Sequence, residues 1–198
     1  MDEIIIKRIE ESIAVKQGLL RNENLLEKLD DAAHVILDCL KNGNKIVLCG
    51  NGGSASDALH FAGEIVGRFQ KERVAWPAVV LNADVATMTA IANDYSYNDV
   101  FARQAEGHVN SGDVFIGIST SGNSENVLRA LEVAKSKGGK TIVLVGKDGG
   151  KLSKVADCSL VVPCMVTARV QECHIMLIHI MCEMVENMMC EEVNKFDR

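Results

Sequence analysis

The sequence predicts an α/β fold: a three-layer α/β/α sandwich around a five-stranded parallel sheet, preceded by N-terminal helices. Short apolar runs alternate with amphipathic helical segments along most of the chain. These runs are apolar at consecutive positions, which is typical of strands that helices cover on both faces. The 198 residues, 47% of them apolar, suit a single structural domain and exclude a disordered chain.

The first 41 residues form a predicted helical extension. Their apolar positions recur at helical spacing and fit two amphipathic helices, broken near residues 21–24. Asn42, Gly43 and Asn44 follow as a stop and turn signal. We expect residues 1–41 to pack on the domain formed by residues 42–198 and at a subunit interface.

The rest of the chain alternates between strands and helices. The predicted strands are short apolar runs at 45–50, 78–81, 114–118, 141–145 and 159–162. The predicted helices lie at 55–68, 85–91, 100–106, 126–137, 149–156 and 168–192. Functional groups of such sheets lie beyond the carboxyl ends of the strands. We therefore expect chemistry in the loops after Cys49, Leu81 and Ile118.

Composition excludes several classes of protein. The chain has 21 basic and 27 acidic residues and only 4% aromatic residues, which argues against nucleic-acid binding. Seven cysteines without a CxxC pair, and an acidic N-terminus, indicate thiols in a reducing cytoplasm. No uninterrupted apolar run approaches the roughly 20 residues that span a bilayer. We expect a cytoplasmic protein that binds neither nucleic acid nor membrane.

The first loop, residues 49–57, lies between a predicted strand and a predicted helix. Its glycines let the backbone approach an anion, and Ser54 and Ser56 can donate hydrogen bonds. The N-terminus of the following helix adds unpaired N–H groups and a partial positive charge. The pattern is neither a Walker loop nor GxGxxG. An ordinary strand-to-helix turn with a serine cap is the alternative interpretation.

The second loop, residues 118–126, concentrates hydroxyl groups. Ser119, Thr120, Ser121 and Ser124 fall within six residues, after an apolar run and before a helix. One helix cap needs fewer hydroxyls than this, so the loop suits a phosphomonoester held by hydroxyls and backbone N–H groups. A helix cap with a solvated loop is the alternative.

Three ionisable residues are candidates for proton transfer. His60 and Glu64 are four residues apart, so they share one face of the predicted helix. Apolar neighbours at Ala62 and Ile65 would partly desolvate Glu64, which suits a general base. His179 interrupts an apolar stretch and needs a hydrogen bond or a function there. A surface pair and a satisfied core histidine are the alternatives.

The two loops resemble those of the sugar isomerase (SIS) domain family, whose flavodoxin-like domains bind phosphosugars. Segments 60–64, 67–68, 93–94, 120–124, 146–150 and 171–179 are similar to the phosphoheptose isomerase branch of that family, in order from about residue 40 to 190. This resemblance implies an aldose–ketose isomerase that converts sedoheptulose 7-phosphate to D-glycero-D-manno-heptose 7-phosphate by general acid/base proton transfer. That reaction is the first step toward nucleotide-activated heptoses, which supply lipopolysaccharide and other surface glycans.

The same resemblance implies the residue roles. By this resemblance Glu64 is the general base and His179 the general acid. The implied metal is zinc, bound by His60, Glu64, Gln171 and His179. Substrate binding is implied for Asn51, Gly52, Gly53, Glu64, Asn93, Asp94, Ser119, Thr120, Ser121, Ser124 and Gln171. A homotetramer with sites near subunit interfaces is implied too, with no redox or nucleotide cofactor.

Gln171 fits the implied metal site poorly. Eight residues separate Gln171 from His179, which is about 12 Å along a helix. Either Gln171 precedes the helix proper, or the site draws on more than one subunit. Glutamine is also a weaker zinc ligand than histidine or cysteine, so the catalytic pair is better supported than the metal.

Two non-catalytic functions are alternatives to the isomerase. A SIS-domain protein of this type can bind the bacterial replication initiator, or it can sense a sugar phosphate. The presence of both Glu64 and His179 favours the enzyme over the initiator-binding protein. Sensors usually carry a second domain, for which we expect no room in 198 residues.

Overall fold

A computed structural model describes the chain over residues 3–196, and its side chains over residues 3–191. Two helices, α1 (Glu3–Leu20) and α2 (Glu23–Lys41), open the chain, as predicted. The break between them has a local cause. The side chain of Asn22 accepts a hydrogen bond from the backbone N–H of Leu25 and so caps α2.

The sheet has five parallel strands in the order β2-β1-β3-β4-β5. All five strands were predicted; they are β1 (Ile46–Gly50), β2 (Ala78–Val80), β3 (Val114–Ser119), β4 (Lys140–Gly146) and β5 (Cys158–Val162). After β2 the chain crosses to the other side of β1 to form β3, so the strand order reverses between β1 and β3. Ligands of such sheets bind at this switch point, and both hydroxyl-bearing loops leave from it.

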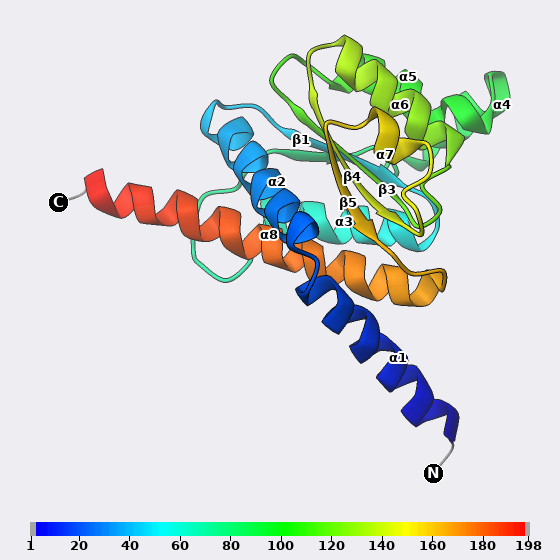
Figure 1. The fold of residues 1–198 in the computed structure, drawn as a ribbon. Coiled ribbons are helices and arrows are strands. Elements are labelled where there is room, and N and C mark those ends of the chain that lie inside the picture. The colour runs from blue at the N-terminus through cyan, green and yellow to red at the C-terminus, as the bar shows by residue number, and fades with distance from the viewer. Residues whose placement is uncertain (1–2, 197–198) are drawn as a thin grey trace.

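Helices cover both faces of the sheet (Figure 1). The helix α3 (Gly53–Val66) joins α2 and the last helix, α8 (Thr167–Phe196), on one face. The opposite face carries α5 (Val100–His108), α6 (Glu125–Ser136) and α7 (Leu152–Val155), with α4 (Val85–Asp94) and a 3-10 turn (Tyr97–Asp99) at its edge. This is the predicted three-layer α/β/α sandwich.

The helix predicted at 149–156 is wrong at its start. It begins only at Leu152, because Gly149 and Gly150 have φ angles of 87° and 57° and form a turn. Glycine adopts such angles without the steric penalty that other residues incur. The 3-10 turn at Tyr97–Asp99 was not predicted.

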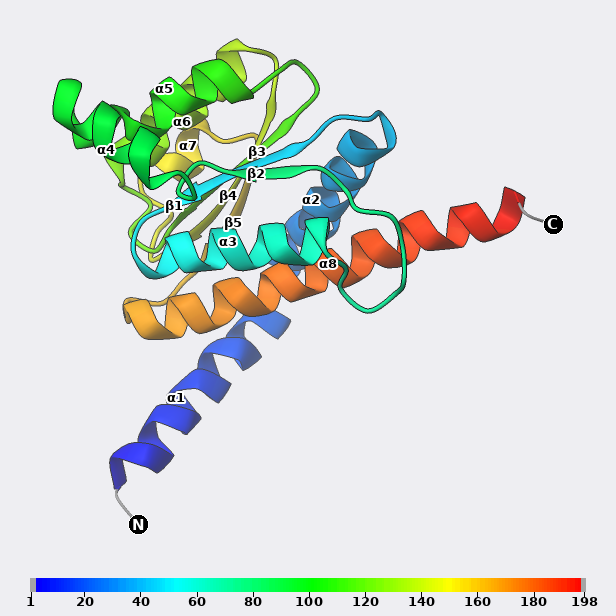
Figure 2. The ribbon, with the colours of Figure 1, turned by 180° about the vertical axis from the view of Figure 1, so that it is seen from behind.

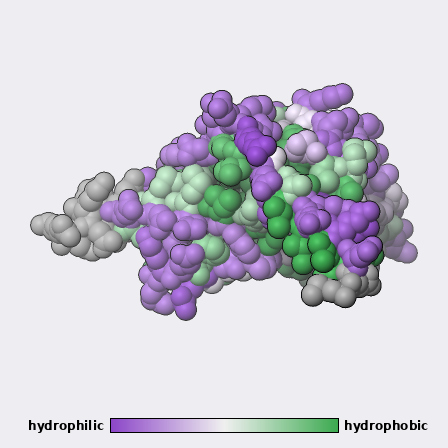
Figure 3. Space-filling view, turned by 60° about the horizontal axis from the view of Figure 1, so that its bottom comes forward, coloured by the Kyte–Doolittle hydropathy of each residue, from purple (hydrophilic) through white to green (hydrophobic). Residues whose placement is uncertain are grey.

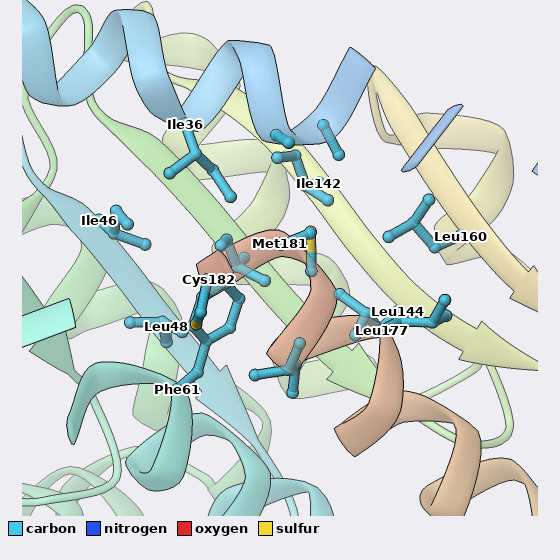
Figure 4. Close-up of a cluster of buried hydrophobic side chains, with 14 of the residues drawn as sticks. Ile36, Ile46, Leu48, Phe61, Ile142, Leu144, Leu160, Leu177, Met181 and Cys182 are labelled. Atoms are coloured by element: carbon cyan, nitrogen blue, oxygen red, sulfur yellow. The ribbon is translucent and has the colours of Figure 1, made fainter. Parts of the chain in front are cut away.

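Alternating strand residues supply two separate cores. Leu48, Ile142 and Leu144 point toward α2, α3 and α8, and Figure 4 shows them around Phe61 and Met181. The residues between them in sequence face the other way, into a second core beneath α5 and α6. Because both faces are buried, the strands are apolar at consecutive positions.

The helix α8 is the longest apolar segment. Within Thr167–Glu191 an 18-residue window reaches a mean hydropathy of 1.2, so the helix meets the length and composition of a membrane span, which we did not expect. However, Cys173, Leu177, Met181 and Val185 recur every four residues and lie in the core beneath the sheet. The helix therefore has the pattern of a core helix, and a core helix passes the same test.

The helix α1 projects from the body of the molecule (Figure 1). Of its side chains, only Leu19 is buried. Ile5, Ile6, Ile9 and Ile13 are about half exposed and share one side of the helix. Figure 3 shows apolar side chains gathered beside the N-terminal end of the chain.

Candidate active site

The serine-rich loop after β3 and the glycine-rich loop after β1 enclose a small pocket. Its volume is about 100 Å³, and its lining includes four of the predicted phosphate-binding residues and two residues of the first loop. These lining residues are Asn51, Ser54, Ser119, Thr120, Ser121 and Ser124, together with Ile118. The structure therefore brings together both loops that the sequence singled out.

The hydroxyl groups of this pocket bond to one another. The Oγ of Ser119 lies 2.9 Å from the Oγ of Ser124 and 3.4 Å from that of Ser121. Ser124 occupies the N-cap position of α6, yet its side chain makes no cap hydrogen bond. The helix α3 also begins without a side-chain cap, at Gly52. A serine side-chain cap therefore explains neither loop. The N-termini of α3 and α6 both lie at the pocket and direct their partial positive charge toward it.

The serine loop turns sharply at Gly122. This residue has a φ of 66°, and a Cβ there would collide with the carbonyl oxygen of Gly149. The backbone N–H of Leu152 donates to the carbonyl oxygen of Gly122 (2.9 Å). The loop after β4 thus supports the serine loop from behind, through contacts that only glycine permits.

Two asparagines and a tyrosine orient the first loop. The amides of Asn51 and Asn126 exchange two hydrogen bonds, of 2.9 and 3.0 Å. The hydroxyl of Tyr97 donates a third, 3.0 Å long, to the Oδ1 of Asn51. Asn82, directly after β2, bonds both the N–H and the carbonyl of Gly50, at 3.1 and 2.7 Å.

Sequence reasoning missed Tyr97, Asn126 and Asn82 as supports of the site. Asn82 follows Leu81, one of the three strand ends that we expected to carry chemistry, so its position was a usable signal. Tyr97 belongs to no motif, and Asn126 ends the second loop without a predicted role. Their partner Asn51 lies 46 and 75 residues away along the chain, so no local pattern indicates them.

The three candidates for proton transfer converge. The Nε2 of His60 lies 3.0 Å from the Oε1 of Glu64 and 3.0 Å from the Nε2 of His179. The donor atoms of all three residues lie within 4.8 Å of one another. The side chain of Glu64 is 25% exposed and that of His60 45% exposed. Glu64 is thus partly withdrawn from water, as its apolar neighbours predicted, while the cluster stays open to solvent.

The amide of Gln171 lies beside Gly53, at the start of α3. Gln171 belongs to α8, four residues after the helix begins, so of the two alternatives the one in which it precedes the helix proper is wrong. A Cβ on Gly53 would collide with its amide, which therefore stands at the start of α3. Seven residues, about 10 Å of helix, separate Gly53 from His60. Within one chain Gln171 borders the serine-loop end of the site.

Asn93 and Asp94 lie at the end of α4 and are exposed. Among the described residues, their side chains bond only to each other, at 2.9 Å. The link from this segment to the serine pocket runs through Tyr97, three residues after Asp94. The structure thus places them near the pocket's support, and no direct contact with its lining is seen among the described residues.

Burial governs the other titratable groups near the site. Burial raises the pKa of Asp57, whose Oδ2 has no hydrogen-bond partner among residues 3–191, while His60 opposes the rise. Burial also raises the pKa of the Cys182 thiol to about 12 and that of Cys39 to about 11. Thiols that stay protonated are poor nucleophiles, which agrees with a structural role for these cysteines.

Comparison with known proteins places the chain in a family. The family model of the SIS domain matches residues 13–146. The chain is 50% identical over 187 residues to a phosphoheptose isomerase of Helicobacter pylori (strain P12), covering 94% of this chain and 96% of the relative. It is 48% identical over 191 residues to a phosphoheptose isomerase of Aquifex aeolicus (strain VF5), covering 96% and 99%.

Solved structures agree. Phosphoheptose isomerase GmhA from Neisseria gonorrhoeae superposes with a TM-score of 0.88 at 43% identity, covering 93% of this chain and 98% of that one. A phosphoheptose isomerase from Francisella tularensis gives a TM-score of 0.89 at 36% identity, covering 93% and 97%. The relatives and the structures each cover more than nine-tenths of this chain. The chain therefore belongs to the SIS domain family and, within it, to the phosphoheptose isomerases.

Proposed function

We propose that this chain is an aldose–ketose isomerase that converts sedoheptulose 7-phosphate to D-glycero-D-manno-heptose 7-phosphate, the first step toward nucleotide-activated heptoses. One observation carries the proposal. The helix α3 links a hydroxyl-lined pocket to a carboxylate–imidazole cluster: Ser54 of the pocket and His60 of the cluster both belong to it, about 9 Å of helix rise apart. An extended heptose phosphate spans such a distance, with its phosphate in the pocket and its carbonyl end at the cluster.

The pocket suits a phosphate without any basic side chain. Ser119, Thr120, Ser121 and Ser124 supply hydroxyl donors, and the N-termini of α3 and α6 supply backbone N–H groups and partial positive charge. We assign Asn51, Gly52 and Gly53 to the pocket's edge and Gln171 to the sugar beside Gly53. Asn93 and Asp94 remain proposed substrate contacts.

The cluster suits proton transfer within the sugar. Glu64 takes the proton from the carbon beside the carbonyl and returns it to the neighbouring carbon. His179 moves the second proton between the two oxygens, because an imidazole both donates and accepts protons near neutral pH. The hydrogens are redistributed within one molecule, so the reaction needs no redox or nucleotide cofactor.

We propose zinc as the metal of the cluster. Two imidazole nitrogens and one carboxylate oxygen form a donor set of catalytic zinc sites, which keep a further position open. The two donor separations of 3.0 Å approach the roughly 3.3 Å between donors of a tetrahedral site with bonds of about 2.0–2.1 Å. Held by these residues, zinc would supply Lewis-acid polarisation of the substrate carbonyl.

Gln171 is the proposed fourth zinc ligand. Its amide lies beside Gly53, and the backbone of residue 171 stands about 12 Å along α8 from that of His179. We therefore propose that a neighbouring subunit supplies this ligand. A site shared between subunits is the second of the two alternatives that the spacing of Gln171 and His179 left open.

We propose a cytoplasmic homotetramer. Residues 1–41 act as the helical extension of the SIS domain formed by residues 42–198: α2 covers the sheet, and α1 contributes to the subunit interface. The half-exposed Ile5, Ile6, Ile9 and Ile13 support this assignment, because a partner helix removes such a face from water.

The initiator-binding protein and the sugar-phosphate sensor are not favoured. About 50% identity to phosphoheptose isomerases over most of the chain supports the enzyme. The convergence of Glu64 and His179 supports it independently, because a binding protein needs no acid–base pair.

The test is proton NMR of the purified protein with sedoheptulose 7-phosphate in deuterated water, with and without added zinc. We expect the anomeric signal of an aldoheptose phosphate, with deuterium at carbon 2 if the proton exchanges on Glu64. The absence of product under both conditions would refute the proposal. Binding to the replication initiator would then be the next measurement.

A further inference from the structure

The loop at residues 67–77 is tied to α8 by one buried carboxylate. Figure 2 shows this loop leaving α3 and passing beside α8 before it reaches β2. Glu186 accepts hydrogen bonds from the backbone N–H groups of Phe69 (3.0 Å), Gln70 (2.7 Å) and Lys71 (2.8 Å). Its Oε1 also accepts from the Nε of Arg73 at 3.0 Å, and the two side chains are 2% and 5% exposed.

Arg73 carries the connection onward to α3. Its Nη2 donates to the carbonyl oxygen of Glu64 (2.7 Å) and its Nη1 to that of Ile65 (3.0 Å). The guanidinium also lies over the ring of Trp76, 3.5 Å from its centre. The last carbonyl groups of a helix lack partners within it, so Arg73 satisfies the end of α3 while it pairs with Glu186. We call this Arg73–Glu186 connection the clamp.

The clamp acts on the two helices that carry the proposed acid and base. One of its carbonyl acceptors belongs to Glu64 itself. On α8, Glu186 lies seven residues after His179, which is about two turns along the same face. Phe69, whose N–H bonds to Glu186, also places its ring 5.8 Å from that of His179. The clamp therefore constrains both residues without reaching the reacting atoms.

Stability alone explains the clamp poorly. A buried ion pair is often matched or exceeded in stability by apolar residues of the same volume. Burial favours the neutral form of Glu186, but the three backbone N–H groups and Arg73 outweigh it and hold its pKa below the usual range. The pair thus stays charged, and its donors and acceptors fix one relative placement of α3 and α8.

We propose that Arg73 and Glu186 are positioning residues of the active site: they set the separation and orientation of Glu64 and His179. This inference rests on the function proposed above for those two residues. A misplacement of about 1 Å in an active site lowers turnover by about 100-fold, so a loosened clamp is expected to affect turnover more than substrate binding.

The main test compares Glu186→Gln with Asp113→Asn. The carboxylate of Asp113 is equally buried (side chain 2% exposed) and pairs with Lys45 (2.6 Å; side chain 22% exposed) at the amino-terminal edge of the sheet. It bonds to Lys45 and Asn110, neither of which belongs to the clamp or the cluster. We expect both variants to lower the melting temperature. Only Glu186→Gln is expected to lower kcat, by about 10- to 100-fold, with KM within about twofold of the wild type.

Arg73→Lys keeps the positive charge and is the second test variant, to be used if Glu186→Gln folds poorly. Lysine cannot donate to Glu186 and to two carbonyl groups in the fixed geometry of a guanidinium. We therefore expect an intermediate loss of kcat. Wild-type kcat in folded Arg73→Lys and Glu186→Gln, or an equal loss in Asp113→Asn, would overturn the proposal.

A cobalt(II) titration followed by visible absorption supplies a readout besides activity. We expect Glu186→Gln to bind cobalt at least about tenfold more weakly than the wild type, as for residues that orient metal ligands, and Asp113→Asn to bind it unchanged. If the wild type shows no turnover, the proposed function fails. The cobalt titration then still tests whether Arg73 and Glu186 position the side chains of Glu64 and His179. The positioning proposal would be overturned if Glu186→Gln bound cobalt as tightly as the wild type, or if the wild type bound no cobalt.

Discussion

His174 is expected to make the folded protein sensitive to mild acid. It lies on α8 and is fully buried, and over the part of the chain that the structure describes neither ring nitrogen has a partner within hydrogen-bond geometry. Burial lowers its pKa from 6.5 to about 4, against a weaker, opposite effect of the Val145 backbone. The ring thus stays neutral in the folded protein under conditions in which the unfolded chain protonates it.

The sign and size of the effect follow from this difference. Between pH 6.5 and about 4 the unfolded state binds the proton and the folded state does not, so stability falls as the pH falls. The full difference corresponds to about 3 kcal/mol, at about 1.4 kcal/mol for each pKa unit. About 2.5 kcal/mol of it is lost by pH 4.5. That is a large share of the roughly 5–15 kcal/mol that stabilises a typical domain.

The assay is urea unfolding between pH 7 and about 4.5, at one protein concentration because assembly contributes to stability. His174→Leu removes the titrating group at similar volume. Between pH 7 and about 4.5, we expect the free energy of unfolding to decrease in both proteins. The decrease in His174→Leu is expected to be about 2–3 kcal/mol smaller than in the wild type. His34→Gln is the matched control, because the side chain of His34 is 53% exposed, and it is expected to keep the wild-type dependence.

Equal pH dependence in wild type and His174→Leu would refute the reasoning. It would mean that His174 protonates in the folded state as readily as in the unfolded state, so that burial without a partner does not govern it. The carboxylates do not obscure the comparison. Glu186, for example, has a lowered pKa, so its contribution is present above pH 4.5 and is lost only below it.

Three further predictions concern the site and the assembly. Glu64→Gln is expected to lower kcat by about 100- to 10,000-fold, because the amide cannot accept the carbon-bound proton, with sugar-phosphate binding retained by calorimetry; a near-normal rate would exclude Glu64 as the base. Ser119→Ala and Ser124→Ala are each expected to raise KM about tenfold, through one lost hydrogen bond to a charged phosphate; an unchanged KM in steady-state kinetics would place the phosphate elsewhere. Ile9→Glu, which puts a charge on the apolar side of α1, is expected to reduce the assembly to smaller species in light scattering, whereas an unchanged mass would remove α1 from the interface.

The sequence by itself determined the elements and the two loops. The apolar run at 114–118 and the alternation around it predict a covered parallel strand, because side-chain periodicity reports which faces of an element are buried. Turn residues such as Gly43 mark where elements end. The parallel sheet then places the loops after β1 and β3 at one edge. Even the pairing of His60 with Glu64 is local, since helical spacing alone puts them on one face.

Only the tertiary structure decided which distant groups meet. His179 reaches His60 across 119 residues of sequence, and Glu186 reaches Phe69 across 117. The amide of Gln171 packs on Gly53, which stands seven residues before His60 on α3. These contacts depend on how far α8 slides along α3 and at what angle the two cross. Periodicity reports which face of a helix is buried, but that placement is set by the packing of the whole core.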